Sequence, residues 1–258
     1  MVYLKYLDLF KAGYKVRYAL ISDVHANLAA LQAVIEEIEH QDCGRVICLG
    51  DVVGYGPRPQ RCLDITRTLT DHIILGNHDV AIFNTPEELS FNPIARNAIV
   101  WTRSQLSESN ISYLQQLPYT ITFDRCLGVH ASPCSPQSWD YITGRFDALR
   151  NFNCFSQPVS FAGHTHSPVV FQRRAGKHKV RVLETDHLKI EQGFQYIINI
   201  GSVGQPRDRD PRAAFGIWDS EQLVYELVRV DYDISLTQSQ MQKAGLPRFL
   251  SDRLEHGV

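Results

Sequence analysis

The sequence lacks several features that would point directly to a function. Its 258 residues contain no C-x-x-C pair, no internal repeat, no low-complexity segment and no run of lysine and arginine. With 26 basic and 28 acidic side chains, the formal net charge is -2. There is no basic excess to follow a nucleic-acid backbone, which argues against an extended nucleic-acid surface.

Membrane and secretion signals are also missing from the start of the chain. The first 14 residues mix apolar side chains with Lys5, Asp8 and Lys11, have no continuous apolar centre and are not followed by a small-residue cleavage site. They are therefore neither a membrane span nor a signal peptide. We interpret residues 1–15 as an N-terminal extension and expect a cytoplasmic protein that makes no membrane contact.

The cysteines are scattered, and several lie inside apolar runs. This pattern predicts buried free thiols in a reducing compartment rather than a disulfide framework. The six are Cys43, Cys48, Cys62, Cys126, Cys134 and Cys154.

The composition, 44% hydrophobic and 21% charged, is that of an ordinary globular protein, and we expect one domain over residues 1–258. Strand, helix and strand patterns alternate at the start, which predicts a right-handed crossover unit with parallel strands. Residues 85–118 read as a helical insertion, residues from 119 onward as mostly β, and residues 235–254 as a helical tail. The predicted class is α/β (α+β), with two packed sheets flanked by helices.

Apolar runs in this chain repeatedly end in side chains that bind metals. The run from Val46 to Leu49 stops at Gly50 and is followed by Asp51, at the C-terminal end of a predicted strand, where open α/β sheets bind ligands. One such aspartate could equally cap a turn. Five strand ends of this kind favour a functional site. The other candidates are Asp23 and His25, Asn77 with His78 and Asp79, His130, and His164 with His166.

Carboxylate and imidazole together suit Mn, Fe, Co or Zn, and two neighbouring ions need one carboxylate that bridges them. Asp51 is our candidate for that bridge. Asp23, His25 and one histidine of the His164/His166 pair would complete one shell, and Asn77, His130 and the other histidine would complete the second. We expect residues 164–166 to be extended, so that both histidines point the same way.

Five ordered blocks resemble the signature of the calcineurin-like metallophosphoesterase superfamily. They are Asp23-x-His25, Gly50-Asp51-x-x-Gly54, Gly76-Asn77-His78-Asp79, His130 and Gly163-His164-x-His166, within residues 16–230. The resemblance implies a four-layer αββα sandwich of two mixed sheets and a site with two divalent cations, Mn first, with Fe, Co, Ni or Zn as alternatives. Its ligands would be Asp23, His25, Asp51 and His166 for one ion, and Asp51, Asn77, His130 and His164 for the other.

The resemblance further implies hydrolysis of a small phosphate mono- or diester, nucleotides included, by a hydroxide that bridges the ions. His78 would act on the leaving group, and Asp79 would hold its ring. Many members have Asp-Arg where this chain has Val53-Gly54, and Asp79 is followed by Val80 where protein phosphatases have an arginine. These departures argue against a Ser/Thr protein phosphatase and favour the small bacterial phosphoesterases, some of which are grouped with diadenosine tetraphosphatases.

Two points stay open at this stage. In the segment 201–212, Arg207, Arg209 or Arg212 could bind phosphate, or Asp208 and Asp210 could pair with these arginines in a plain surface turn. A catalytically silent scaffold and a mononuclear zinc hydrolase compete with the dinuclear enzyme, although the first usually lacks ligands and the second leaves Asn77 unexplained. We expect Tyr55 and Trp139 to contribute to selectivity, and we make no prediction of the oligomeric state.

Overall fold

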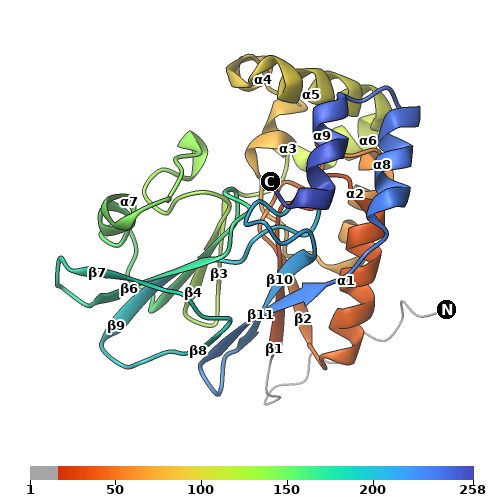
Figure 1. Cartoon of the computed structure of the whole chain (residues 1–258). Coiled ribbons are helices and arrows are strands. Elements are labelled where there is room, and N and C mark those ends of the chain that lie inside the picture. The colour runs from red at the N-terminus through yellow and green to blue at the C-terminus, as the bar shows by residue number, and fades with distance from the viewer. Residues whose placement is uncertain (1–16) are drawn as a thin grey trace.

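Two mixed β-sheets packed face to face form the centre of the molecule. They are seen in the computed structural model of Figure 1, which describes residues 17–258. One sheet has the strand order β2-β1-β10-β11-β8, and the other has the order β3-β4-β5-β9-β6-β7. Their bounds are β1 Arg17–Ile21, β2 Arg45–Cys48, β3 Thr120–Phe123, β4 Cys126–Val129, β5 Val159–Ala162, β6 Val169–Arg174, β7 Val180–Leu183, β8 His187–Lys189, β9 Phe194–Asn199, β10 Ala213–Asp219 and β11 Val224–Val230.

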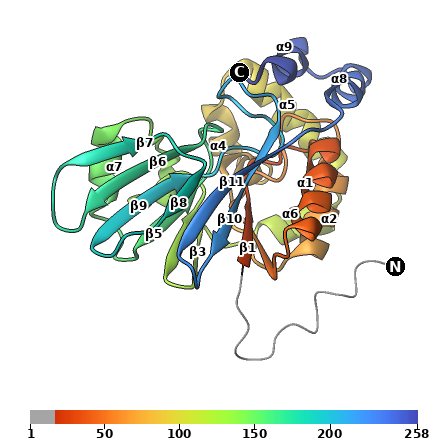
Figure 2. The ribbon, with the colours of Figure 1, turned by 60° about the horizontal axis from the view of Figure 1, so that its bottom comes forward.

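Helices cover the outer faces of both sheets, as Figures 1 and 2 show. Helices α1 and α2 lie beside the five-stranded sheet, whereas α7 lies by β6 and β7. The bounds are α1 Leu28–His40, α2 Pro59–Leu69, α3 Asn77–Ala81, α4 Thr85–Ser90, α5 Pro93–Gln105, α6 Glu108–Leu114, α7 Arg145–Asn151, α8 Ile234–Lys243 and α9 Arg248–Asp252, with short 3-10 turns at Pro136–Ser138 and Arg253–His256.

The alternation of side chains along β1 explains the layers. Ala19 and Ile21 pack in the buried cluster that includes Val34 of α1, while Tyr18 and Leu20 belong to the cluster between the two sheets. Successive strand residues face opposite sides, so a strand that is apolar on both sides must be covered on both. A third cluster joins α7 to the outer face of the six-stranded sheet. Three apolar interfaces therefore separate four layers, and the αββα prediction is confirmed.

The first crossover unit also forms as predicted. Strands β1 and β2 are parallel, and the Asn27 side chain caps α1 by accepting a hydrogen bond from the Ala30 N–H. Helices α4, α5 and α6 lie within residues 85–118, and the helical tail is broken between the end of α8 and the start of α9, at residues 244–247. Within residues 17–258, no helix combines the length and the apolar character needed to cross a membrane.

Other expectations need correction. The apolar run 73–75 makes only a single bridge, from Ile73 to Cys48, and Asn77 begins α3 rather than following a strand. Helix α7 and strands β6 and β8 were not predicted, because their short segments show no clear period. The N-terminal extension at residues 1–15 lies outside the described residues.

The cysteine prediction is wrong for one pair. Cys134 and Cys154 form a disulfide, with Cα atoms 5.0 Å apart, whereas Cys43, Cys48, Cys62 and Cys126 are free and buried as expected. The pair joins a loop after β4 to the turn that follows α7, and this proximity arises from tertiary packing that the spacing of the cysteines does not show.

Candidate metal centre

The predicted ligands meet where strands of both sheets end. Asp23 and His25 follow β1, Asp51 follows β2, His130 follows β4, and the pair His164 and His166 follows β5. Asn77 adds an amide from the first residue of α3. Parallel strands bring their C-terminal ends to one edge, and here the parallel pairs β1/β2 and β4/β5 contribute one such edge from each sheet.

The backbone at this edge is unusual. Five of the ligand candidates have positive, left-handed φ angles, which residues other than glycine seldom adopt. They are Asp23 at 54°, His25 at 46°, Asp51 at 53°, His164 at 67° and His166 at 58°. Such strain is characteristic of functional sites. Residues 164–166 are therefore bent, and our expectation of an extended segment is wrong.

Two glycines allow the close packing of the carboxylates. A Cβ atom on Gly76 would overlap Oδ1 of Asp51, and one on Gly163 would overlap Oδ2 of Asp23, so any larger residue would displace a carboxylate. These glycines keep the aspartates close to the backbone N–H groups that hold them. His164 N–H donates to Oδ2 of Asp23, and His78 N–H donates to Oδ1 of Asp51.

The first group of ligand atoms consists of Asp23, His25 and His166, whose ligand atoms lie within 4.8 Å of one another. Oδ1 of Asp23 is 3.1 Å from Nε2 of His166 and 3.7 Å from Nε2 of His25. All three side chains are buried. One carboxylate oxygen and two ring nitrogens thus face a common point.

The second group consists of Asp51, His130 and His164, and Asn77 adjoins it. Nε2 of His130 is 3.3 Å from Oδ2 of Asp51 and 3.2 Å from Oδ1 of Asn77. The same Oδ2 atom of Asp51 is 3.6 Å from Nε2 of His25 in the first group. One oxygen of Asp51 therefore lies between the two groups, as a bridging ligand requires.

Backbone carbonyls fix the orientation of the histidine rings. Nδ1–H groups of three rings donate to carbonyl oxygens, which turns the Nε2 atom of each ring toward the site. The pairs are His25 with Val53 at 3.2 Å, His130 with Leu49 at 2.8 Å, and His166 with Gln205 at 2.6 Å. His164 is reversed, because its Nε2–H donates to the Trp139 carbonyl at 2.9 Å and Nδ1 is left as the ligand atom.

This arrangement fits a divalent cation. Oδ1 of Asp23 is fully buried, yet it accepts no hydrogen bond from any residue within 17–258. Two Nε2 atoms with outward lone pairs, those of His25 and His166, lie 3.0 Å apart. Crowded, electron-rich atoms repel one another unless a cation or a proton lies among them. Mixed oxygen and nitrogen donors suit Mn, Fe, Co, Ni or Zn.

The electrostatic environment keeps most of these groups in their ligand forms. Burial alone would raise the carboxyl pKa values, but His166 beside Asp23 and His130 beside Asp51 hold both pKa values well below the ordinary range. Burial lowers the pKa of His164 to about 4 and that of His166 to about 3, with help from the positive charges of His130 and Arg207, respectively. Burial also acts on His130, but the two carboxylates outweigh it and raise its pKa to about 9.

His78 is buried beside this centre and is held by aromatic rings. Its ring centroid is 4.2 Å from that of Tyr55 and 4.7 Å from that of Phe91, and its Nδ1 atom has no hydrogen-bond partner among residues 17–258. The expectation that Asp79 holds this ring is wrong. Burial lowers the pKa of His78 well below its ordinary value, so the ring is neutral near pH 7.

Asp79 organises the backbone instead. Its carboxylate accepts hydrogen bonds from the N–H groups of Asp51 at 2.7 Å, Gly76 at 3.1 Å and Val53 at 3.2 Å. It therefore ties the loop after β2 to the start of α3, the two segments that supply Asp51 and Asn77. Burial and the negative charge of Asp51 raise its pKa to about 7.

The structure separates the two arginines proposed for substrate. Arg207 lines the cavity beside the centre, donates to Oε1 of Gln205 at 2.6 Å and lies over the Tyr55 ring. Arg212 is exposed, pairs with Asp210 at 2.6 Å and is not part of the cavity wall. Arg207 therefore remains a candidate for binding phosphate, whereas Arg212 fits the interpretation of a plain surface turn.

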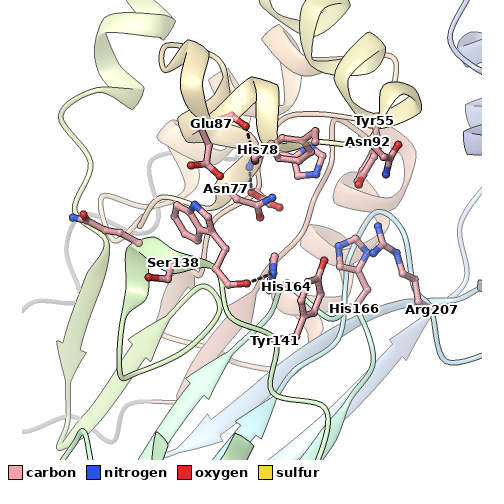
Figure 3. Close-up of a pocket in the computed structure, with 15 residues that line it drawn as sticks. Tyr55, Asn77, His78, Glu87, Asn92, Ser138, Tyr141, His164, His166 and Arg207 are labelled. Atoms are coloured by element: carbon pink, nitrogen blue, oxygen red, sulfur yellow. Dashed lines mark hydrogen bonds between the residues drawn. The ribbon is translucent and has the colours of Figure 1, made fainter.

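A cavity of about 460 Å³ opens beside the ligand groups (Figure 3). Tyr55 and Trp139, which the sequence suggests for selectivity, both line it. Sequence reasoning missed most other wall residues because no local pattern marks them. The helical insertion supplies Glu87, Ser90, Phe91 and Asn92, and the loop after β4 supplies Gln137, Ser138 and Tyr141.

Comparison with known proteins places this geometry in a family. A model of the calcineurin-like phosphoesterase superfamily domain matches residues 16–222. An uncharacterised protein from Methanocaldococcus jannaschii is 34% identical over 245 residues, covering 93% of this chain and 98% of that protein.

Solved structures agree with the family match. The crystal structure of a metallophosphoesterase from Sphaerobacter thermophilus is 40% identical, with a TM-score of 0.82, and the match covers 95% of this chain and 100% of that one. A hypothetical protein from Pyrococcus horikoshii, 20% identical with a TM-score of 0.77, shares the fold over 94% of this chain and 99% of its own.

Proposed function

Because the chain belongs to the calcineurin-like phosphoesterase superfamily, we propose that it is a metal-dependent phosphoesterase that hydrolyses a small phosphate mono- or diester. The observation that carries this proposal is the position of Oδ2 of Asp51. That atom lies 3.6 Å from Nε2 of His25, which groups with Asp23 and His166, and 3.3 Å from Nε2 of His130, which groups with His164. Such an arrangement suits two cations and a shared carboxylate.

Each cation would have its own ligand set with Asp51 in common. One set is Asp23, His25, Asp51 and His166, and the other is Asp51, Asn77, His130 and His164. Mn is the first candidate, and Fe, Co, Ni and Zn suit the same donors. When bound, such ions supply Lewis acidity and lower the pKa of a coordinated water from about 15.7 to about 7.

The remaining residues would act on the substrate. The neutral ring of His78, held by Tyr55 and Phe91, is placed to donate a hydrogen bond to the oxygen of the leaving group. The Arg207 guanidinium, held by Gln205, is placed to bind phosphate oxygens. Both side chains line the same cavity as the ligands, so a phosphate held by the cations would lie within their reach.

A hydrolysis screen tests this proposal. The purified chain would be assayed with an aryl phosphomonoester, an aryl phosphodiester and diadenosine tetraphosphate, each with added Mn and each with a chelator. We expect hydrolysis of at least one substrate with Mn and its loss with chelator. A protein that binds two metal ions but hydrolyses none of the three would contradict the proposal and indicate a binding module.

A further inference from the structure

The cavity beside the metal centre carries opposite charges at its two sides. Figure 3 shows Arg207 on the side of His166 and Glu87 beyond His78 and Asn77, on the other side of the ligand group. Glu87 comes from α4 and is partly buried, and this burial raises its pKa. A phosphate would be attracted to the cations and Arg207 and repelled by the Glu87 carboxylate. The Glu87 side therefore suits an uncharged group that donates hydrogen bonds.

A flat aromatic surface lines the same cavity. One face of the Tyr141 ring stacks on the ligand His164, with centroids 4.2 Å apart and an angle of 29° between the planes. Yet Tyr141 is 53% exposed, and it lines the cavity. A large ring with an uncovered surface beside a ligand cavity gains free energy when another planar group stacks on it.

The loop that carries Tyr141 is held firmly against the metal centre. The Trp139 carbonyl, two residues earlier, accepts the hydrogen bond from Nε2–H of His164. Asp140 pairs with Arg150 at 3.0 Å, and the Cys134–Cys154 disulfide closes the loop. The exposed surface of Tyr141 is thus fixed relative to the metal ligands, so little ordering would be needed when a ligand binds.

We propose that the organic group of the phosphate ester is a nucleoside, whose base stacks on Tyr141 and whose ribose hydroxyls donate hydrogen bonds to Glu87. This inference rests on the proposed function and adds the substrate class. A carboxylate is well suited to accept from sugar hydroxyls, and base stacking on an aromatic ring contributes about 1–3 kcal/mol. A cavity of about 460 Å³ is within the range for such small ligands.

Binding of phosphonates, whose C–P bond is not hydrolysed, tests the inference without relying on catalysis. We would titrate the Mn-loaded chain by calorimetry with an adenosine phosphonate, the matching ribose phosphonate and inorganic phosphate. We expect the adenosine compound to bind about tenfold more tightly than the ribose compound. Tyr141→Ala should remove this preference, whereas Tyr141→Phe should keep it. Phe146→Ala, at a position that is 90% exposed and outside the cavity wall, is the matched control and should keep it too.

The proposed contact between Glu87 and the ribose is tested by a separate substitution. Glu87→Gln should weaken both ribose-containing ligands at least about threefold while leaving the affinity for inorganic phosphate unchanged or higher. Equal binding of the two phosphonates, or a base preference that survives Tyr141→Ala, would overturn the inference while leaving the proposed phosphoesterase untouched. If inorganic phosphate itself fails to bind the Mn-loaded chain, the proposed function fails and the inference fails with it.

Discussion

The Nε2 atoms of His25 and His166 lie 3.0 Å apart although both rings donate their Nδ1–H groups to backbone carbonyls. In that tautomer each Nε2 carries a lone pair, and the two lone pairs face each other in a buried site. Oδ1 of Asp23, 3.1 Å from Nε2 of His166, adds further negative charge. This contact between two histidines far apart in the chain is the strongest local reason to place a cation here.

We predict that His78→Ala lowers kcat roughly 10²-fold or more and leaves both metal ions bound. His78 lines the cavity and belongs to neither of the two ligand sets proposed above, so the loss of the ring should affect chemistry more than metal content. Kinetics with the best substrate of the screen, together with metal analysis, would check this. His178→Ala, at an exposed position, is the control. An unchanged kcat would exclude His78 from the reaction.

Asp79→Asn should destabilise the fold. Its carboxylate accepts three backbone N–H groups, and an amide would place an NH₂ group against at least one of them. A buried donor left without a partner costs about 1–3 kcal/mol. Urea unfolding in chelator should show this loss, and Asp147→Asn, on the less buried α7, should show a smaller one. Equal stabilities of the wild type and Asp79→Asn would contradict the structural role.

Arg207→Ala should raise KM for a phosphate ester about tenfold, because a charged hydrogen bond to the phosphate is lost. Arg212→Ala should leave KM unchanged, since this side chain pairs with Asp210 outside the cavity. Steady-state kinetics on both variants compare the two arginines directly. If the two substitutions have the same effect on KM, our assignment of Arg207 to the substrate is wrong.

The helical insertion should loosen in acid. Glu88 is only 5% exposed and pairs with Arg103 at 2.7 Å, and Arg103 also donates to the carbonyls of Ala81 and Ile82 at the end of α3. Hydrogen bonds from Arg103 hold the pKa of Glu88 below its ordinary value.

A lowered folded-state pKa means that this contribution is present above the unfolded-state value of about 4.3 and is lost as the pH falls through the lower folded-state value. Glu88→Gln should therefore lower the unfolding midpoint at pH 7, and the difference from the wild type should shrink below about pH 4. A difference that stays constant down to acid pH would show that the Glu88 charge does not stabilise the insertion.

The sequence predicts which side chains come together at the candidate site, because their signal is local. An apolar run followed by Asp51 or His130 indicates both a buried strand and a polar side chain just after its end. The left-handed backbone at His164 and His166 leaves no such trace, and its contacts are with distant segments, such as the hydrogen bond from the His164 N–H to Asp23.

Long-range contacts explain the other features that the sequence did not predict. The role of Asp79 depends on backbone groups of the loop after β2, far from it in the sequence, which no spacing rule shows. Tyr141 and Glu87 reach the cavity from separate segments, and Cys134 and Cys154 come from opposite sides of α7 in the sequence. Such relationships arise when the layers pack, so they are properties of the tertiary structure rather than of any single segment.

The most direct test of the central claim is the number of metal ions held by each chain. The protein would be saturated with Mn, freed of excess ion and analysed by plasma mass spectrometry, beside His166→Ala and the exposed-site control His178→Ala. The account predicts two ions per chain for the wild type and the control, and about one for His166→Ala, because His166 belongs to only one ligand group. A wild-type chain that retains one ion or none would contradict it.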